Sequence, residues 1–292
     1  MNALKQVSLR HLVSALFAAP LLFSTAYASA EDAAPAVEAA AAPAAAAPAE
    51  PAPPYTLAFN LGLYSSYMFR GVDLSDGIAL QGGIDWAHSS GFYLGTWWSN
   101  LDPYVNGGTP GGTKGNHLET DWYGGYAHTF DNGLGINAMG NYYYYPNGTK
   151  IGDKTESSFE ASLALSYKYF TYTYYRVLTD YYGALPNDGG KDTKGADYHE
   201  LKVNYKLPVG DLNFMSKIGY QRTPHLNGSE GDFAIGLNKD FSIPSAGKPV
   251  DGFNAGGYFT KTFSVDDQAF YTSTSGRLTN EDKLWFYVKR TW

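Results

Sequence analysis

From Tyr55 to Trp292, apolar and polar residues alternate along short segments that are separated by Gly, Asn, Asp and Ser. Because successive side chains of a β-strand point to opposite faces, this pattern predicts strands with one apolar and one polar face. The predicted strands cover residues 55–64, 78–86, 92–101, 118–130, 134–145, 158–169, 171–182, 198–207, 212–222, 232–241, 253–263 and 283–292. We therefore expect a fold of twelve strands.

The segment from Ser158 to Tyr169 shows the alternation best, because apolar residues such as Phe159 alternate there with polar ones such as Glu160. The first strand has the same pattern, and we expect Tyr67 and Phe69 to extend its apolar face. Such faces need cover from a second sheet in a soluble protein, or from lipid in a membrane barrel. Alternation alone is compatible with both.

Two of the predicted strands are harder to orient. The segment from Phe92 to Leu101 carries aromatic residues on both faces, so its inner face stays unassigned. In the segment from Thr171 to Tyr182 we place Arg176 on the inner face, since a charged side chain should avoid lipid.

The last segment, from Lys283 to Trp292, has a strongly apolar face. A chain that ends on an aromatic residue in such a strand resembles the closing strand of bacterial outer-membrane barrels, which the barrel assembly machinery recognises. We therefore expect that machinery as a partner, with an assembly signal formed by Trp292, Val288 and Phe286. Arg290 interrupts the apolar face, but at the membrane boundary its guanidinium can extend to water.

The connections between the strands favour a membrane barrel over a soluble sandwich. Every other connection is long, as in residues 102–116, 146–155, 183–197, 223–231 and 264–282, and the remaining ones are mostly tight, as in 89–91, 131–133 and 208–210. Outer-membrane barrels have this asymmetry, with short periplasmic turns and longer extracellular loops. The long connection at 242–252 is the exception.

The N-terminal part of the chain is organised differently. Residues 1–30 have the features of a secretory signal peptide, with Lys5 and Arg10 before an apolar stretch and small residues around Ala28 and Ala30. Residues 31–54 are almost entirely Ala and Pro, which cannot bury a core, so we predict a disordered periplasmic linker. The barrel is then residues 55–292, in the bacterial outer membrane.

Composition narrows the class of protein further. The chain contains 25 Tyr, 16 Phe and 6 Trp residues together with 33 Gly, which suits the aromatic girdles and tight corners of a barrel. It contains no cysteine, so a disulfide scaffold is excluded. The formal net charge is −7 without a basic cluster, so we expect no nucleic-acid partner.

Charged residues on the polar faces are the candidate pore-lining residues, because charges around a lumen bias the passage of ions and polar solutes. They are Arg70, Asp85, Glu119, Asp121, Glu160, Arg176, Glu200, Lys202 and Lys217. The histidines are scattered, and no Cys or close His spacing supports a metal site. We therefore predict no catalytic residues, no metal and no cofactor. A metal site or a protease-like site at the outer rim is a less favoured possibility, and it would consist of His117 and His199 with Glu119, Glu200 and Asp121.

Two stretches carry a family resemblance. Residues 65–71 with 75–77, and residues 81–100, together with 119–126, resemble the proteobacterial TorF family of porins, which also bears the domain name Gcw_chp. The resemblance covers the first part of the predicted barrel. It implies an outer-membrane channel without naming what passes through it, because the family has no established substrate or catalytic residues.

Taken together, the sequence predicts a porin-like channel for passive diffusion of small hydrophilic solutes or ions. Its other expected partners are outer-membrane lipid and lipopolysaccharide. One alternative is a plugged barrel with a structural or surface-contact role, because charges in a narrow barrel can pair across the interior. A barrel enzyme is the second alternative, and the predicted function is not enzymatic.

Overall fold

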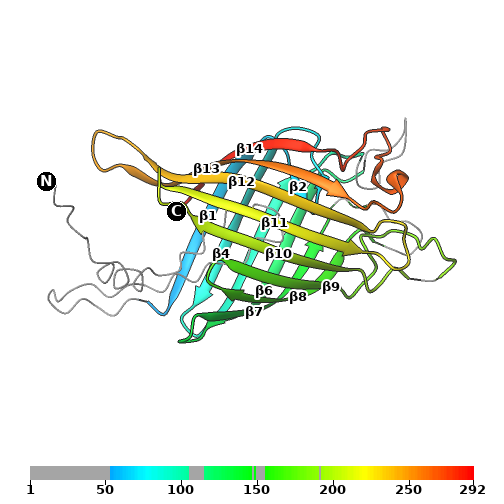
Figure 1. The fold of residues 1–292 in the computed structure, drawn as a ribbon, viewed down its shortest axis with the longest axis horizontal. Coiled ribbons are helices and arrows are strands. Elements are labelled where there is room, and N and C mark those ends of the chain that lie inside the picture. Colours follow the sequence, from blue (N-terminus) through cyan, green and yellow to red (C-terminus); the bar gives the residue numbers. More distant parts are fainter. Residues whose placement is uncertain (1–52, 105–114, 147, 149–154, 191) are drawn as a thin grey trace, which may run out of the picture.

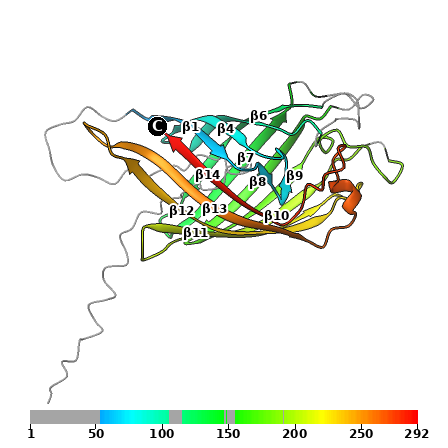
Figure 2. The same ribbon diagram turned by 90° about the horizontal axis from the view of Figure 1, so that it is seen from above.

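The computed structural model describes residues 53–104, 115–146, 148, 155–190 and 192–292. Within them, twelve strands form one closed antiparallel barrel, and two further strands form a small separate sheet (Figures 1 and 2). The predicted all-β closed barrel is confirmed. The predicted signal peptide (1–30) and all but the last two residues of the predicted linker (31–54) lie outside the described residues.

The barrel strands follow the predicted ranges closely, except that the strand predicted at 171–182 ends at Val177. They are β1 (Tyr55–Tyr64), β4 (Ala79–His88), β5 (Phe92–Asn100), β6 (Leu118–Thr129), β7 (Leu134–Tyr144), β8 (Ser158–Tyr167), β9 (Phe170–Val177), β10 (Asp197–Lys206), β11 (Leu212–Arg222), β12 (Glu230–Ile243), β13 (Val250–Phe263) and β14 (Lys283–Thr291). The connections contain β2 (Met68–Phe69), β3 (Val72–Asp73) and the 3-10 helix η3 (Gln268–Tyr271). Each barrel strand pairs with its neighbours in the chain, except that β4 pairs with β1 and β1 pairs with β14.

The two faces of the barrel wall differ as the alternation predicts. Outward side chains form an apolar belt, in which Leu163 is 50% exposed and Ile84 is 43% exposed. Inward positions hold buried aromatic and polar side chains instead, such as Tyr93 on β5 and Glu160 on β8. A contiguous apolar exterior on a closed barrel is stable against lipid, where every backbone polar group must be paired within the protein. The chain is therefore a bacterial outer-membrane barrel.

The inner face of β5 is now assigned. Tyr93, Trp97 and Ser99 are buried in the interior, while Phe92 and Leu94 face outward.

Among the described residues, no helix has both the length and the apolar character needed to cross a membrane.

The two rims differ in the length of their connections, as predicted. The ends of the barrel at Tyr55 and Trp292 lie on the rim of short turns. The predicted long connection at 242–252 is wrong in detail, because β12 and β13 stay paired as far as Ile243 and Val250. Their hairpin instead projects beyond the rim on the side where the C-terminus lies (Figures 1 and 2).

The first and last strands close the barrel. β1 and β14 pair from Asn60 with Thr291 to Tyr64 with Tyr287. The backbone of Trp292 exchanges two hydrogen bonds with that of Phe59, at 2.9 and 3.0 Å. The guanidinium of Arg290 donates from Nε to the backbone oxygen of Asp251 at 3.2 Å, so one of its N–H groups is satisfied at the rim.

A charge placed on the outer face should destabilise the barrel far more than the same charge on the inner face. We expect Leu163→Arg, in the middle of β8, to lower the free energy of unfolding by about 2–4 kcal/mol, the cost of a cation at the bilayer midplane. Ser162→Arg is the matched control, because Ser162 is next to Leu163 in the chain and its own side chain points inward and is partly exposed. Urea titration of protein refolded into liposomes measures both, and equal losses would contradict the assignment of faces.

Candidate functional site

A short hairpin occupies the interior of the barrel. It consists of the connection between β1 and β4, residues 65–78, in which β2 and β3 pair through Met68 with Asp73 and Phe69 with Val72. We call it the lumen hairpin. The prediction that Tyr67 and Phe69 extend the outward face of the first strand is wrong, because β1 ends at Tyr64 and both rings are buried inside.

The tip of the lumen hairpin is a tight turn at Arg70 and Gly71. Their φ angles are +45° and +86°, the left-handed values of the turn type that most often joins two paired strands. A Cβ on Gly71 would lie 2.6 Å from Cγ2 of Thr262 and 2.9 Å from Cβ of Asp232. Glycine is required here both by the backbone angle and by the close approach to the wall.

Arg70 extends the tip to the far wall. Its Nη1 donates to Oε1 of Gln221 at 2.8 Å, and its Nη2 lies 3.0 Å from both carboxylate oxygens of Glu160. Its guanidinium carbon lies 4.4 Å from the ring centroid of Tyr198 and 4.9 Å from that of Tyr175. These residues lie on β8 to β11, which are opposite β1 and β4 in the barrel order. The lumen hairpin therefore spans the full width of the lumen.

The arms of the lumen hairpin pack against β5 to β7 and against Tyr182 in the connection after β9. The hydroxyl of Tyr67 donates to Oε1 of Glu119 at 3.0 Å, and its ring packs on Trp97 with centroids 5.2 Å apart. Phe69 makes edge contacts with the rings of Tyr143 and Tyr182. Polar and aromatic contacts together leave the wall side chains around the hairpin buried.

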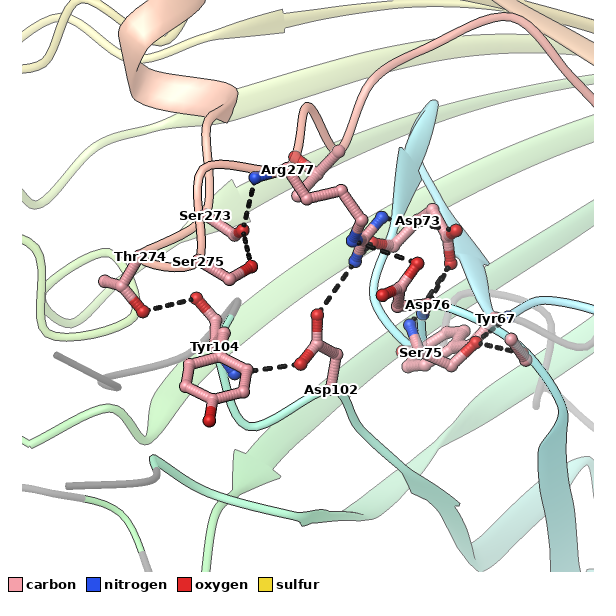
Figure 3. A network of polar contacts seen from close by, with 12 residues as sticks. Tyr67, Asp73, Ser75, Asp76, Asp102, Tyr104, Ser273, Thr274, Ser275 and Arg277 are labelled. Carbon is pink, nitrogen blue, oxygen red and sulfur yellow. Dashed lines mark hydrogen bonds and ion pairs between the residues drawn. The ribbon is translucent and has the colours of Figure 1, made fainter. Parts of the chain in front are cut away.

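The base of the lumen hairpin is fixed by the long connection between β13 and β14 (Figure 3). Arg277 from that connection forms ion pairs with Asp73 at 3.4 Å, Asp76 at 3.2 Å and Asp102 at 3.1 Å. Asp73 also pairs with Lys283 at the start of β14. These ion pairs, which we call the anchor, hold the outer end of the lumen hairpin to the connection between β13 and β14, to the start of β14 and, through Arg277, to the connection between β5 and β6.

Asp73 is the carboxylate at the centre of this anchor. Burial raises its pKa, but hydrogen bonds from Lys283 and from the hydroxyl of Ser66 outweigh that effect. The pKa of Asp73 consequently lies below its ordinary value of 3.8. The anchor is therefore ionised at neutral pH.

The far wall carries its own network of charges. Lys217 lies 3.3 Å from Glu200 and 3.3 Å from Asp232, and Lys202 lies 3.3 Å from the other oxygen of Glu200. The hydroxyl of Tyr198 donates to Asp232 at 2.6 Å. Charges of both signs are therefore paired in the interior beside the hairpin tip.

Toward the rim of short turns, the inward side chains are more accessible. Asp85 accepts hydrogen bonds from Tyr123 and, at 3.3 Å, from Asn60, and it remains partly exposed. Inward residues of β8 and β10 in this half, such as Ser162 and Asn204, are partly exposed as well. This half is therefore accessible in part, although other inward side chains in it, such as Tyr93, Asn238 and Asn254, are buried.

The structure brings eight of the nine predicted pore-lining residues to the interior. Arg70 lies on the lumen hairpin, and the other seven project inward from the wall; these are Asp85, Glu119, Asp121, Glu160, Glu200, Lys202 and Lys217. Asp121 is fully buried and accepts a hydrogen bond from Asn141 at 3.3 Å, while its Oδ1 has no hydrogen-bond partner within the described ranges.

The predicted inward orientation of Arg176 is wrong. Arg176 pairs with Ala161 across the ladder and shares the outer face with Tyr172 and Tyr174. It is 40% exposed and lies 3.0 Å from Asp197, which also pairs with Arg222 at 2.5 Å. The position is at the outer end of β9, where a guanidinium is not required to lie in hydrocarbon. Lipid avoidance is therefore no guide to the face of a residue at a strand end.

Sequence reasoning missed the residues that receive the hairpin. Tyr175, Tyr198 and Gln221 occupy inward positions of strands whose ranges were predicted, so alternation could have placed them in the lumen. Asp73 and Arg277 lie in connections, where alternation gives no information. No local signal identifies which of them meet.

The histidine arrangement considered for a barrel enzyme does not assemble. Glu119, Asp121 and Glu200 are buried inward, whereas His199 faces outward and contacts the hydroxyl of Tyr172 at 2.7 Å. His88 and Ser90 do lie 2.7 Å apart, but the same ring nitrogen accepts from the backbone N–H of Ser90, as in a turn cap. In the part of the chain that the structure describes, no group of three His, Cys, Asp or Glu residues could hold a metal ion.

Comparison with known proteins gives one family match. The model of a family described as "Bacterial protein of unknown function (Gcw_chp)" matches residues 48–292. The resemblance to Gcw_chp proteins is confirmed, and the family description does not include the TorF name. No curated protein matches the chain.

Several solved structures show a weak similarity to this chain. The KdgM porin is 8% identical with a TM-score of 0.44, and the alignment covers 80% of this chain and 98% of that one. The NanC porin is 7% identical with a TM-score of 0.42, covering 81% and 98%. Pseudomonas aeruginosa OccK5 (OpdH) is 16% identical with a TM-score of 0.38, covering 80% and 67%. Similarity this low carries no argument about function.

Neutralising the anchor should destabilise the protein in a pH-dependent way. We expect Asp73→Asn to lower the free energy of unfolding at neutral pH by about 2 kcal/mol, as for a hydrogen bond to a charged group. Because the pKa of Asp73 is lowered on folding, its contribution is present above 3.8 and is lost as pH falls through the folded value.

Urea titration in detergent at a series of pH values measures this difference. Asp211→Asn is the matched control, since its ion pair with Lys206 at 3.8 Å is exposed and should contribute little. A wild-type advantage over Asp73→Asn that persisted unchanged at the lowest pH would contradict the assignment.

Proposed function

We propose an outer-membrane channel as the function, from the premise that this chain belongs to the Gcw_chp family of bacterial proteins. Small hydrophilic solutes or ions pass by passive diffusion, and the lumen hairpin keeps the passage closed. The observation that carries the proposal is that one discrete hairpin crosses the lumen to the far wall, while several inward side chains toward the rim of short turns, such as Ser162 and Asn204, remain partly exposed. No catalytic step is part of this function.

The interior of the wall supports this proposal. A hydrated path needs polar side chains, and charges of both signs along it bias which solutes enter. We propose that Arg70, Asp85, Glu119, Asp121, Glu160, Glu200, Lys202 and Lys217 line this path. The acids outnumber the bases among them, which favours the entry of cations.

The way in which the lumen hairpin is held also supports a gate. Its own ladder consists of two residue pairs, and it is separate from the barrel sheet. Its tip and base are held by ion pairs, hydrogen bonds and ring contacts. Such contacts can be exchanged for water or solute without breaking a barrel strand. Displacing the hairpin therefore opens the lumen and leaves the wall intact.

A plugged barrel is the second candidate, and the burial of the hairpin tip favours it. Arg70 is 3% exposed and Glu160 is 2% exposed, and breaking such a pair typically costs about 3–5 kcal/mol. If the hairpin never leaves, the barrel serves a structural or surface-contact role through its outer loops. Conductance measurements separate the two candidates.

We also propose two partners outside the lumen. The barrel assembly machinery recognises β14 through Trp292, Val288 and Phe286, which share its exposed outer face. Lipopolysaccharide contacts the outer end of β9 to β11, where Arg176 and Arg222 face outward. The guanidinium groups of Arg176 and Arg222 share the single carboxylate of Asp197 there. The cluster of these three residues therefore keeps a net positive charge, which suits a lipid phosphate.

Removing the lumen hairpin should open the channel. We expect a variant in which residues 67–76 are replaced by Gly-Ser to conduct in planar bilayers at least about tenfold more than the wild type, because it lacks the segment that reaches from β1 and β4 to the far wall. The control variant lacks residues 186–190, which belong to the outer connection between β9 and β10. A wild type that inserts correctly and never conducts, beside a conducting hairpin-free variant, would support the plugged barrel, and a hairpin-free barrel that inserts and stays silent would contradict the channel.

Binding of lipopolysaccharide should depend on the outward arginines. We expect Arg176→Ala/Arg222→Ala to retain less purified lipopolysaccharide than the wild type in native mass spectrometry, because the phosphate loses both guanidinium partners. Dephosphorylated lipopolysaccharide is the probe control and should bind the wild type as weakly as the intact lipid binds the variant. Lys261→Ala is the matched variant control, because Lys261 already pairs with Asp282. Equal retention by both variants would contradict the assignment.

A further inference from the structure

The wall site that holds Arg70 has the composition of a receptor for a cation. We propose that it is a binding site for small organic cations that carry a guanidinium group, and that the tip of the lumen hairpin occupies it in the closed channel. The proposal rests on the channel function and names a substrate class for it. The site consists of Glu160, Gln221, Tyr175 and Tyr198, which we call the guanidinium cage.

The guanidinium cage belongs entirely to the barrel wall. Its members come one each from β8, β11, β9 and β10, so they stay in place when the hairpin moves. All four side chains are buried, and all four lie within strands of the barrel wall. The cage is therefore a preformed site that the hairpin enters.

The ligands of the cage match a guanidinium better than other groups. The carboxylate of Glu160 and the amide oxygen of Gln221 accept from two different nitrogens of Arg70. The rings of Tyr175 and Tyr198 lie 4.9 and 4.4 Å from its central carbon, within the range of cation–π attraction. A planar cation with several N–H donors satisfies all four groups, whereas a compact ammonium cannot donate to both acceptors in the same fixed geometry.

Charge makes an empty cage unfavourable. Among the residues that the structure describes, Arg70 is the cation that forms an ion pair with Glu160. The neighbouring lysines are already engaged, because Lys217 pairs with Glu200 and Asp232 and Lys202 pairs with Glu200. The hydroxyl of Tyr143 also donates to Glu160 at 3.1 Å but brings no charge, and a buried carboxylate without a cationic partner is strongly destabilised. When the hairpin leaves, Glu160 therefore attracts a cation from the lumen, or water enters the site.

This arrangement makes the solute a competitor of the hairpin tip. A guanidinium compound in the lumen binds the same carboxylate and the same rings as Arg70, so each excludes the other. The wild-type channel then opens more often when such a compound is present. Anions gain nothing at the cage, since its one charged member is an acid.

The test uses Arg70→Ala, which vacates the cage and leaves the wall unchanged. We expect millimolar methylguanidinium to reduce the single-channel current of Arg70→Ala in a saturable manner, because it occupies the cage within the lumen. Methylammonium is the probe control and should block at least about tenfold less well. In Arg70→Ala/Glu160→Gln the methylguanidinium block should disappear, whereas Arg70→Ala/Asp211→Asn should retain it.

A second measurement does not depend on conductance. Methylguanidinium should raise the midpoint of thermal unfolding of Arg70→Ala in detergent and leave that of Arg70→Ala/Glu160→Gln unchanged. If Arg70→Ala does not fold, the hairpin-free variant carries the same test, because it also exposes the cage. A conducting channel that methylguanidinium neither blocks nor stabilises would overturn the cage and leave the channel function standing. A silent hairpin-free barrel that methylguanidinium stabilises would overturn the channel and keep the cage.

Discussion

The contact between Arg70 and Glu160 is the interaction on which the closed state of the interior depends. It joins the tip of a hairpin that follows β1 to a strand on the opposite side of the barrel. A charge pair buried in this way is stable only when both partners and their hydrogen bonds are present together. Gln221 and the rings of Tyr175 and Tyr198 complete that environment. This contact fixes the tip of the lumen hairpin, while Tyr67 and Phe69 fix its arms and Asp73 fixes its base.

The barrel wall and the lumen hairpin are stabilised by different kinds of interaction. The wall is held by continuous backbone ladders and by apolar contact with lipid, so it tolerates a polar interior. The hairpin contributes two short strands and is held mainly by side chains, with backbone hydrogen bonds to the outer connections at Asp73 and Leu74. Strong but local contacts of this kind allow one element to move as a unit while the scaffold stays rigid. A closed passage and a stable barrel are therefore compatible in one chain.

Alternation in the sequence predicted the strands and most of their faces, because a period of two residues is a local property. The same rule failed at Tyr67 and Phe69, since their spacing matches a strand although the chain turns inward after Tyr64. It failed at Arg176 because the end of a strand is not surrounded by hydrocarbon. The cage could not be predicted either, because its contacts join residues as far apart in the chain as Arg70 and Gln221. Such pairings depend on the closed geometry of the barrel.

The anchor at Lys283 has a consequence for how the protein is made. Lys283 begins the last strand, while its partner Asp73 follows the first strand, and these two strands form the seam of the barrel. The lumen hairpin is therefore held by the barrel strand that comes last in chain order. During biogenesis it can enter sideways through the open seam, and the pairing of β14 with β1 then encloses it. Closure of the barrel can therefore enclose the lumen hairpin in the same step.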